Sequence, residues 1–480
     1  MNETALNLTV FILAFAGMVI VHELGHFLAA RMVKVEVEEF GIGFPTPGAI
    51  TFWIGKGYFL LRNGKRIEIP RNFHMPVPWN ELADHETKIS VDEVDGRLIL
   101  RSIEAVVFEE QRQPRARANK LNDIHVDANG KVVEPRGDKA KTVMVERLVK
   151  AGKTNGATEL TGVIAETHPG TRFTLNWLPL GGFVRPKGEN DPNIAGGLAA
   201  AAPWKRLFVL VAGPIMNLIT AFLVYSFIVS SVGAYDFEKV LVTAVFPDSP
   251  AEQAGLQQGD IFISGDGQVI KSYEDLSAIV SANEGQPVVF LVDRDGQQVS
   301  LSVTPRLVED QERVMIGVGL SLPYRSTGSF AENLEWGVKY TNRNIYALLS
   351  LPAKMIRGSL PAEQTRLVGL KGIYDIMGQS IEMGIEASEN ATDSRPFYWY
   401  IPVLEIVATL SISLGIFNLF PFPALDGGRI LFVLPEMLFR RRVPHQFENL
   451  VHGLGMTFLL ALMLYVNVRD FIDPISTSFP

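Results

Sequence analysis

The sequence predicts an α-helical polytopic membrane protein with about four transmembrane helices, an α+β module and a β-rich insertion. Hydrophobic residues make up 47% of the 480 residues, and many of them gather into four long runs. A helix rises about 1.5 Å per residue, so each run is long enough to cross the hydrocarbon core of a bilayer. The polar stretches between the runs carry turn signals and alternating patterns that indicate folded soluble parts.

The first run belongs to residues 1–35 and is interpreted as a retained transmembrane helix. It lacks the positively charged start of a signal peptide, and it is longer than the hydrophobic region of one. Arg31 and Lys34 follow the run. The positive-inside rule therefore places that end of the helix on the cytoplasmic side.

Within this helix lies the motif His22-Glu23-Leu24-Gly25-His26. Residues four apart share one face of a helix, so His22 and His26 can bind the same metal ion. Glu23 is placed to accept a proton from a metal-bound water, which is the chemistry of metal-dependent hydrolysis. The chain has no cysteine, which excludes cysteine-ligated metal, disulfides and a thiol nucleophile.

Three polar regions follow the first helix. Residues 36–75 alternate apolar and polar and are rich in glycine and proline, which predicts a membrane-associated β-hairpin region. Residues 76–170 carry mixed charges and turn signals, and we expect an inserted soluble β-rich segment there. Its basic stretch at 112–120 has no interleaved aromatic residues, so we expect a solvated loop and no nucleic-acid partner. Residues 171–206 are predicted to form a returning β-hairpin and a link.

The second run, residues 207–232, carries no charged residue and is predicted to span the membrane. Gly213-Pro214 is expected to interrupt this helix, and Asn217 follows one turn later. One interpretation is a closely packed helix interface, because small residues let helices approach each other. We favour a second interpretation, in which Asn217 lines a cavity, because an amide in hydrocarbon needs a partner.

An α+β module is predicted at residues 238–306. It resembles a PDZ domain through Ser249-Pro250-Ala251, Ala254-Gly255-Leu256 and Gly259-Asp260-Ile261. PDZ domains bind an extended peptide as an added strand. A module that only gates access sterically is an equal alternative. The predicted elements are strands at 240–245 and 256–263, a helix at 275–280 and a hairpin at 288–303.

The C-terminal part of the chain holds two more hydrophobic runs. Residues 330–380 are amphipathic and are expected to form helices at the membrane surface. Residues 397–420 form the third predicted span, in which Glu405 is expected near the outer interface. Residues 421–450 are predicted to form a loop that contains Leu-Asp-Gly-Gly and then a cytoplasmic loop. The fourth span is predicted at residues 451–468.

The distribution of charge sets an orientation for the four spans. Residues 31–206 hold 26 Lys and Arg against 22 Asp and Glu, whereas residues 231–396 hold 13 against 22. The positive-inside rule therefore favours a cytoplasmic-side insertion and an extracytoplasmic α+β module. The metal-binding motif is then expected near the cytoplasmic side of the membrane.

A catalytic zinc site usually takes three protein ligands and leaves one position for water. No third histidine follows at the short spacing of soluble metalloproteases. The other six histidines lie in polar segments or beside a span. Asp426 is the best candidate, because it follows a stretch broken by prolines and precedes two glycines that allow close approach. Taken alone, however, an Asp-Gly pair more often marks an ordinary turn.

Together, these motifs resemble the site-2 protease family of intramembrane zinc metalloproteases, of the bacterial type that carries a PDZ domain. The resemblance covers most of the chain outside the insertion. It departs from the family's pattern at Leu370, where the family often has proline. The matching segments are 22–26, 40–43, 178–184, 213–217, the α+β module and 418–428.

The resemblance implies an enzyme that hydrolyses peptide bonds within transmembrane segments. The implied substrates are single-span membrane proteins, such as anti-sigma factors or signal-peptide remnants, cleaved in regulated intramembrane proteolysis. The implied location is the bacterial inner membrane, with lipid around the spans and a peptide or C-terminus at the PDZ domain. The implied roles are zinc binding by His22, His26 and Asp426, general base catalysis by Glu23, and substrate binding by Asn217 and Asn418.

Two other classes of function stay open at this stage. The protein could be a catalytically inert membrane scaffold that binds peptides through its α+β module. It could also be a membrane-anchored metalloprotease that cleaves soluble peptides. The activity of a Glu23→Gln variant separates the first alternative from an enzyme, and the position of the cleaved bond separates the second.

Overall fold

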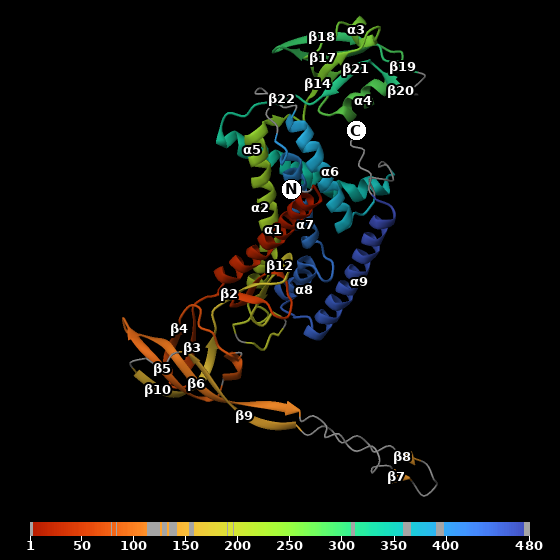
Figure 1. The fold of residues 1–480 in the computed structure, drawn as a ribbon. Coiled ribbons are helices and arrows are strands. Elements are labelled where there is room, and N and C mark those ends of the chain that lie inside the picture. Colours follow the sequence, from red (N-terminus) through yellow and green to blue (C-terminus); the bar gives the residue numbers. More distant parts are fainter. Residues whose placement is uncertain are drawn as a thin grey trace. The chain divides into compact units, whose positions relative to one another are not determined.

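In the computed structural model, the chain forms two compact units, and each is described by itself. Figure 1 shows the order of the helices and strands. The first unit comprises residues 9–216 and 417–461, and the second comprises residues 1–8, 217–416 and 462–480. The described residues are 3–77, 79–82, 84–112, 125–126, 132–133, 142–152, 158–189, 191–194, 196–308, 313–358, 366–389 and 398–474.

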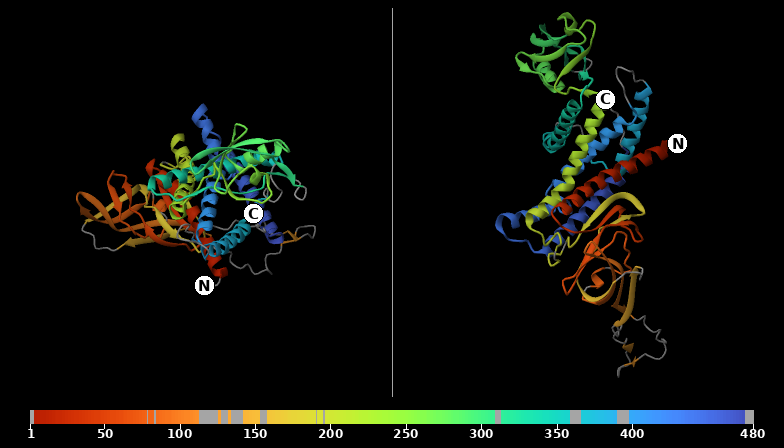
Figure 2. Two further views of the ribbon diagram at one scale, coloured as in Figure 1. Left: turned by 90° about the horizontal axis from the view of Figure 1, so that it is seen from above. Right: turned by 90° about the vertical axis from the view of Figure 1, so that its left-hand side faces the viewer.

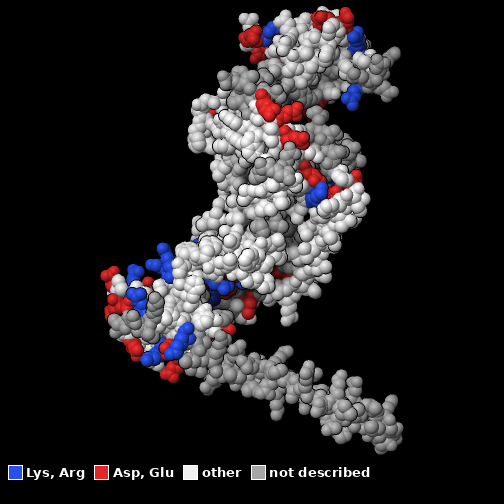
Figure 3. All heavy atoms as spheres, in the orientation of Figure 1, with Lys and Arg blue, Asp and Glu red and all other residues white. Residues whose placement is uncertain are grey.

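Four helices in the described residues are long and apolar enough to cross a membrane, which confirms the prediction of four apolar helices. Figure 3 shows that most charged side chains on the visible face gather on the β-rich parts, while the long helices are largely uncharged there. The four helices are α1 (Glu3–Met32), α2 (Pro203–Val232), α7 (Ile401–Leu419) and α9 (His445–Ile472).

Gly213-Pro214 does not interrupt α2, contrary to our expectation. The helix is continuous, and Pro214 lies inside it. Proline removes one backbone hydrogen bond and crowds the carbonyl four residues earlier. Transmembrane helices tolerate this loss because neighbouring groups satisfy the freed carbonyl.

A four-stranded sheet stands beside the end of α1 in the first unit. Its strand order is β12-β1-β11-β2, so β2 is an edge strand. Buried Glu39 of β1 accepts hydrogen bonds from Thr174 and Arg185, which satisfies its charge inside the sheet. The strands are β1 (Val37–Phe44), β2 (Ile50–Ile54), β11 (Arg172–Leu175) and β12 (Leu178–Pro186).

A second sheet of the first unit curls into a small barrel (Figure 2). Its order is β4-β3-β10-β5-β6-β9, and a further pairing of β4 with β6 closes five of these strands into a ring. The barrel core is apolar, and Phe59, Ile89 and Leu100 in it are fully buried. Its elements are β3 (Gly57–Leu61), β4 (Arg66–Ile69), the 3-10 helix η1 (Trp79–Leu82), β5 (Glu86–Val94), β6 (Arg97–Arg112), β9 (Thr142–Gly152) and β10 (Thr158–His168).

The barrel therefore combines β3 and β4, from the region predicted as a membrane-associated hairpin, with strands from the predicted insertion. Two short strands, β7 (His125–Val126) and β8 (Val132–Val133), pair with each other. Residues 113–120 of the basic stretch lie outside the described residues, so the prediction of a solvated loop there stays a prediction.

The α+β module belongs to the second unit. Its sheet has the order β18-β17-β15-β14-β21, and β16 pairs with β15. Ser249 and Ser272 cap its two helices by accepting a hydrogen bond from the backbone three residues on. The elements are β14 (Val240–Val245), α3 (Pro250–Gln253), β15 (Ile261–Gly265), β16 (Gln268–Val269), α4 (Tyr273–Ala282), β17 (Val288–Arg294), β18 (Gln297–Val303) and β21 (Val318–Ser321).

The second strand of the module begins later than predicted, at Ile261 instead of residue 256. Gly259 has a φ of +99°, and the Asp260 carboxylate accepts a hydrogen bond from the Gln257 N–H at 2.9 Å. These residues therefore form a turn. Burial raises the pKa of the Asp260 carboxyl, but hydrogen bonds from Arg294 and from the Gln257 amide, together with the charge of Arg294, hold the pKa below its ordinary value.

Helices α5 (Phe330–Ile356) and α6 (Leu370–Glu389) lie where the sequence predicts amphipathic helices. The start of α6 is held by buried Asp470 near the end of α9. Its carboxylate accepts hydrogen bonds from the Gly369 and Gly372 amides, and it pairs with Arg366 at 2.9 Å. A carboxylate at a helix N-terminus stabilises the exposed amides there. Short paired strands complete the unit: β13 (Ala234–Tyr235) with β22 (Tyr324–Arg325), and β19 (Arg306–Val308) with β20 (Arg313–Met315).

Candidate metal centre

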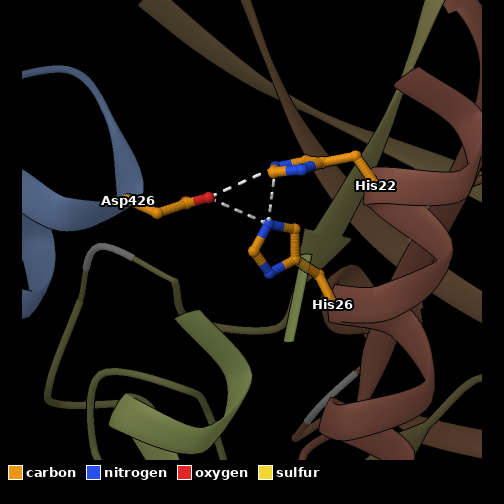
Figure 4. Close-up of side chains that lie close together, drawn as sticks. All are labelled: His22, His26 and Asp426. Carbon is orange, nitrogen blue, oxygen red and sulfur yellow. Dashed lines mark hydrogen bonds and ion pairs between the residues drawn. The ribbon is translucent and has the colours of Figure 1, made fainter. Parts of the chain in front are cut away.

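Three side chains that are predicted zinc ligands converge in the first unit (Figure 4). His22 and His26 come from successive turns of α1, and Asp426 is the first residue of α8 (Asp426–Phe439). Asp426 Oδ2 lies 3.2 Å from Nε2 of each histidine, and the two Nε2 atoms are 3.2 Å apart. The fold thus brings together His26 and Asp426, which are 400 positions apart in the sequence.

A backbone carbonyl of α2 fixes the orientation of the His26 ring. Its Nδ1 lies 2.8 Å from the backbone oxygen of Val209 on α2. A carbonyl only accepts, so this contact assigns the proton to Nδ1 and leaves a lone pair on Nε2. Such a second hydrogen bond is the usual way in which proteins aim a metal-binding imidazole.

The geometry of the three atoms fits a zinc ion. Zinc bonds to histidine nitrogen and carboxylate oxygen are about 2.0–2.2 Å long, so two ligands of a tetrahedral ion stand about 3.3 Å apart. All three observed separations are 3.2 Å. Asp426 Oδ2 is buried, and no hydrogen-bond donor satisfies it within the described residues. A cation held by the three atoms would satisfy this oxygen.

The Asp426 carboxyl is in the charged form that a metal ligand needs. Burial raises the pKa of this carboxyl, but the two imidazoles together lower it by more, so the pKa is below its ordinary value. His22 and His26 are themselves buried, with 6% and 7% of their surface exposed. The centre is therefore largely shielded from bulk solvent.

Glu23 lies beside the centre and is held by the first sheet. Its Oε2 accepts a hydrogen bond from the Val184 N–H of β12 at 3.0 Å. Glu23 follows His22 directly, so its carboxylate starts from the same turn of α1 as a ligand. This arrangement gives a carboxylate of fixed direction next to the three converging atoms.

Helices α1 and α2 approach closely at the metal centre because of two glycines. A Cβ on Gly25 would lie 2.5 Å from the Ala212 backbone oxygen. A Cβ on Gly213 would lie 2.3 Å from Nε2 of His26. Small residues at both positions therefore let α2 support the histidine that it hydrogen-bonds.

Gly213→Ala is expected to lower Zn²⁺ affinity by about 10-fold or more, because the added methyl group displaces the His26 ring from its position beside His22 and Asp426. Gly17→Ala is the matched control, since nothing lies within 4 Å of a Cβ at Gly17 of α1. Titration of both purified variants with Zn²⁺ against a chromophoric chelator measures the effect. Equal affinities in the two variants would contradict this account of the helix contact.

The loop before α8 is shaped by glycines and by a histidine of α9. A Cβ on Gly427 or Gly428 would lie 2.0 Å or 2.3 Å from the backbone oxygens of Phe420 and Phe422. Ala424 has a φ of +78°, and its N–H donates to His452 Nδ1 at 2.9 Å. Gly427 and Gly428 lie in the first turn of α8 and not in the predicted tight turn, so much of the loop predicted at residues 421–450 is a helix that begins at Asp426. The two glycines are needed because this helix packs closely against the backbone of the preceding loop.

The other predicted site residues are not part of the converging group. Asn418 is half-buried in the last turn of α7, eight positions before Asp426. Asn217 is fully buried on α2 and belongs to the second unit, as does Glu405 on α7. The substrate-binding roles expected for Asn217 and Asn418 therefore stay proposals.

Several residues that position the centre were not predicted from the sequence. Val209 and Val184 act through backbone atoms, so their side chains give no signal. His452 was expected to be a surface or interfacial residue, yet its ring holds the loop before Asp426. The i, i+4 spacing of His22 and His26 indicated only the first two ligands, and these supports depend on tertiary contacts.

Comparison with known proteins identifies relatives along most of the chain. The profile of peptidase family M50 matches residues 10–60 and 158–462 and leaves out residues 61–157, which contain most of the barrel. Zinc metalloprotease RasP of Oceanobacillus iheyensis is 27% identical over 483 residues, covering 96% of this chain and 97% of that protein. Metalloprotease MmpA of Caulobacter vibrioides is 29% identical over 340 residues, covering 63% of this chain and 82% of that protein.

Among solved structures, the chain is similar to the PDZ domain of an SdrC-like protein from Listeria monocytogenes. The match covers 18% of this chain and 90% of that one, with 23% identity and a TM-score of 0.16.

The family profile alone spans well over half of the chain, and it includes the parts of α1 and α8 that supply His22, His26 and Asp426. The chain therefore belongs to peptidase family M50, the site-2 proteases that its motifs resemble.

Proposed function

We propose that this protein is a zinc-dependent intramembrane endopeptidase that cleaves peptide bonds within the transmembrane segments of other membrane proteins. The coarser part of this proposal follows from the family and the names of its relatives: the protein is a metalloprotease of the membrane, and zinc is its cofactor. The finer part concerns the site residues, the substrate and the orientation in the membrane.

One observation carries the proposal: the metal centre is built on a helix that is itself apolar enough to span a bilayer. α1 supplies His22, Glu23 and His26, and Thr4–Met32 is one of the four candidate spans. Ionisable side chains are costly at such a depth and usually mark a functional site. A peptide bond that reaches this centre most directly is one that lies in the membrane.

The residues divide the chemistry between binding and proton transfer. His22, His26 and Asp426 would hold zinc, which supplies a polarised water of lowered pKa as the nucleophile. Glu23 accepts a proton from the attacking water and delivers it to the leaving amine. The Val184 N–H keeps the Glu23 carboxylate in one direction during both transfers.

Hydrolysis within a membrane also requires that the substrate helix be opened. Amides in a helix are already hydrogen-bonded and must find new partners in hydrocarbon. Edge strand β2 of the first sheet offers backbone groups to an extended segment. Asn217 and Asn418 are proposed to bind the freed substrate backbone, as the family resemblance implies.

The proposed setting is the bacterial inner membrane, with the metal centre near the cytoplasmic side and the α+β module outside. The excess of basic residues in 31–206 and of acidic residues in 231–396 supports this orientation. The proposed partners are single-span membrane proteins, and a peptide or C-terminus at the α+β module, which keeps its resemblance to a PDZ domain. Regulated proteolysis of an anti-sigma factor or a signal-peptide remnant is the proposed process.

Reconstitution of the full chain with a panel of single-span model substrates tests this function. Mass spectrometry of the products is expected to place the cleaved bond inside the hydrophobic segment, and a Zn²⁺ chelator is expected to stop cleavage. A soluble peptide of the same juxtamembrane sequence serves as the control. Cleavage confined to that peptide would instead identify a membrane-anchored protease of soluble substrates, and absence of cleavage throughout would favour an inert scaffold.

A further inference from the structure

One face of α8 carries Asp426 together with two charged residues and one buried apolar residue. Asp426, Arg429, Val433 and Glu436 are spaced i, i+3, i+7 and i+10. At about 100° per residue these side chains fall within an arc of about 80°. Val433 is 3% exposed, which shows that this face of α8 is packed against the rest of the first unit.

Both charged residues on this face form ion pairs with residues far away in the sequence. Arg429 pairs with Glu189 in the segment between β12 and α2. Glu436 pairs with Arg206 in the first turn of α2, and Arg206 is only 7% exposed. Glu436 pairs with a guanidinium whose side chain is only 9% exposed, so loss of Glu436 would leave a largely buried charge uncompensated. The Arg429–Glu189 pair is more exposed, at 34% and 25%, and adds a second, weaker contact that resists displacement of α8.

Glu189 and Arg206 belong to the part of the first unit that packs against the end of α1. Leu198 and Val209, which flank Arg206 on either side, share a buried cluster with Ala29 and Ala30 of α1. The segment of Glu189 is fixed by backbone hydrogen bonds from Lys187 to Glu36 and from Leu198 to Lys187, both 2.8 Å long. We call this part, made of the end of α1, residues 187–189 and 196–199 and the start of α2, the histidine frame.

The start of α2 presents its contacts on one face. Arg206, Val209 and Gly213 are spaced i, i+3 and i+7, so the residue that pairs with Glu436 lies on the same side as the two that meet His26. The start of α2 therefore contacts His26 and α8 with the same face. A shift of α8 relative to this surface is a shift of Asp426 relative to His26.

We propose that the ion pairs Arg429–Glu189 and Arg206–Glu436 hold α8 in the register at which Asp426 completes the zinc site. The four residues are therefore positioning residues. This inference rests on the proposed zinc ligation by His22, His26 and Asp426. The four side chains are not among the three that converge on the metal centre, and their proposed action is through the position of α8.

The order of charges on the two surfaces makes this register selective. α8 presents a cation and then, two turns later, an anion, whereas the frame presents an anion at Glu189 and a cation at Arg206. A slip of α8 by one turn breaks both pairs, and a slip by two turns brings Glu436 toward Glu189 or Arg429 toward Arg206. Like charges at such contacts are strongly unfavourable, so the observed register is favoured over these slipped ones. Glu436 also lies 3.9 Å from Arg442, which follows α8 and moves with it.

The test is a charge-reversal series on the full-length detergent-purified chain, stripped of metal and titrated with Zn²⁺ against a chromophoric chelator. Glu189→Arg, Arg429→Glu, Arg206→Glu and Glu436→Arg are each expected to lower Zn²⁺ affinity about 10- to 100-fold, as loss of support around metal ligands commonly does. The double reversals Glu189→Arg/Arg429→Glu and Arg206→Glu/Glu436→Arg are expected to restore most of the affinity.

The matched control is the pair Arg62–Asp84 in the same unit. Its atoms are 2.8 Å apart, and its side chains are 63% and 74% exposed. Arg62→Glu and Asp84→Arg make the same changes of charge and are expected to leave Zn²⁺ affinity unchanged. Where a reversal yields no folded protein by circular dichroism and gel filtration, the neutral variants Glu189→Gln and Glu436→Gln replace it, with a smaller loss in the same direction.

A background variant separates positioning from general destabilisation. If the pairs act through Asp426, Glu189→Gln lowers Zn²⁺ affinity in the wild-type chain and has no further effect in Asp426→Ala. An equal loss in both backgrounds, unchanged affinity in the single variants, or failure of both double reversals to restore it would each overturn the proposal. Unchanged affinity in Asp426→Ala itself would instead remove Asp426 from the zinc site and overturn the proposed set of zinc ligands.

Discussion

Replacement of Glu23 by glutamine is expected to reduce kcat by about 10²–10⁴-fold while Zn²⁺ stays bound at full stoichiometry. Glutamine keeps the length of the side chain, and its amide oxygen can still accept the Val184 N–H bond that the carboxylate accepts at 3.0 Å. What it loses is the ability to take a proton from water. The rate of cleavage of a single-span substrate, together with zinc content by mass spectrometry, measures both parts of this prediction.

The matched control for Glu23→Gln is Glu86→Gln, which makes the same chemical change at an exposed position at the start of β5. Its activity is expected to equal that of the wild type. Cleavage by Glu23→Gln at the wild-type rate would show that another group moves the proton. Loss of both cleavage and zinc would show that Glu23 supports the metal centre structurally, since His22 and His26 are its neighbours on α1.

The sequence was sufficient to predict the local parts of this molecule. Four apolar runs gave four apolar helices, and the i, i+4 histidines gave two side chains on one face of α1. The turn at Asp295-Gly296 was found where predicted, because the left-handed conformation of both residues suits an Asp-Gly hairpin. Each of these features depends on residues that are close together in the chain.

The parts that the sequence did not predict depend on distant contacts. The barrel takes β3 and β4 from before the insertion and closes them against β6, and no local pattern indicates that pairing. Pro214 was expected to interrupt α2, but the helix continues through it. Transmembrane helices tolerate a proline when neighbouring groups satisfy the carbonyl that it frees. Asp426 illustrates the same limit, since an Asp-Gly pair is ordinary until the fold places it 3.2 Å from two histidines.

Asp426→Ala is expected to lower Zn²⁺ affinity by more than about 100-fold and to abolish cleavage, because two imidazoles alone do not make a three-ligand catalytic site. In the metal-free protein the same substitution also removes the pairs at 3.2 Å between Asp426 Oδ2 and the two imidazoles, so the apo protein is expected to be less stable than the wild-type apo protein. Zinc titration and thermal unfolding of the metal-free chain measure these two effects. Glu93→Ala, at an exposed position of β5 in the same unit, is the control and is expected to change neither. Retained zinc affinity would exclude Asp426 as a ligand and would leave His22 and His26 in need of a different third partner.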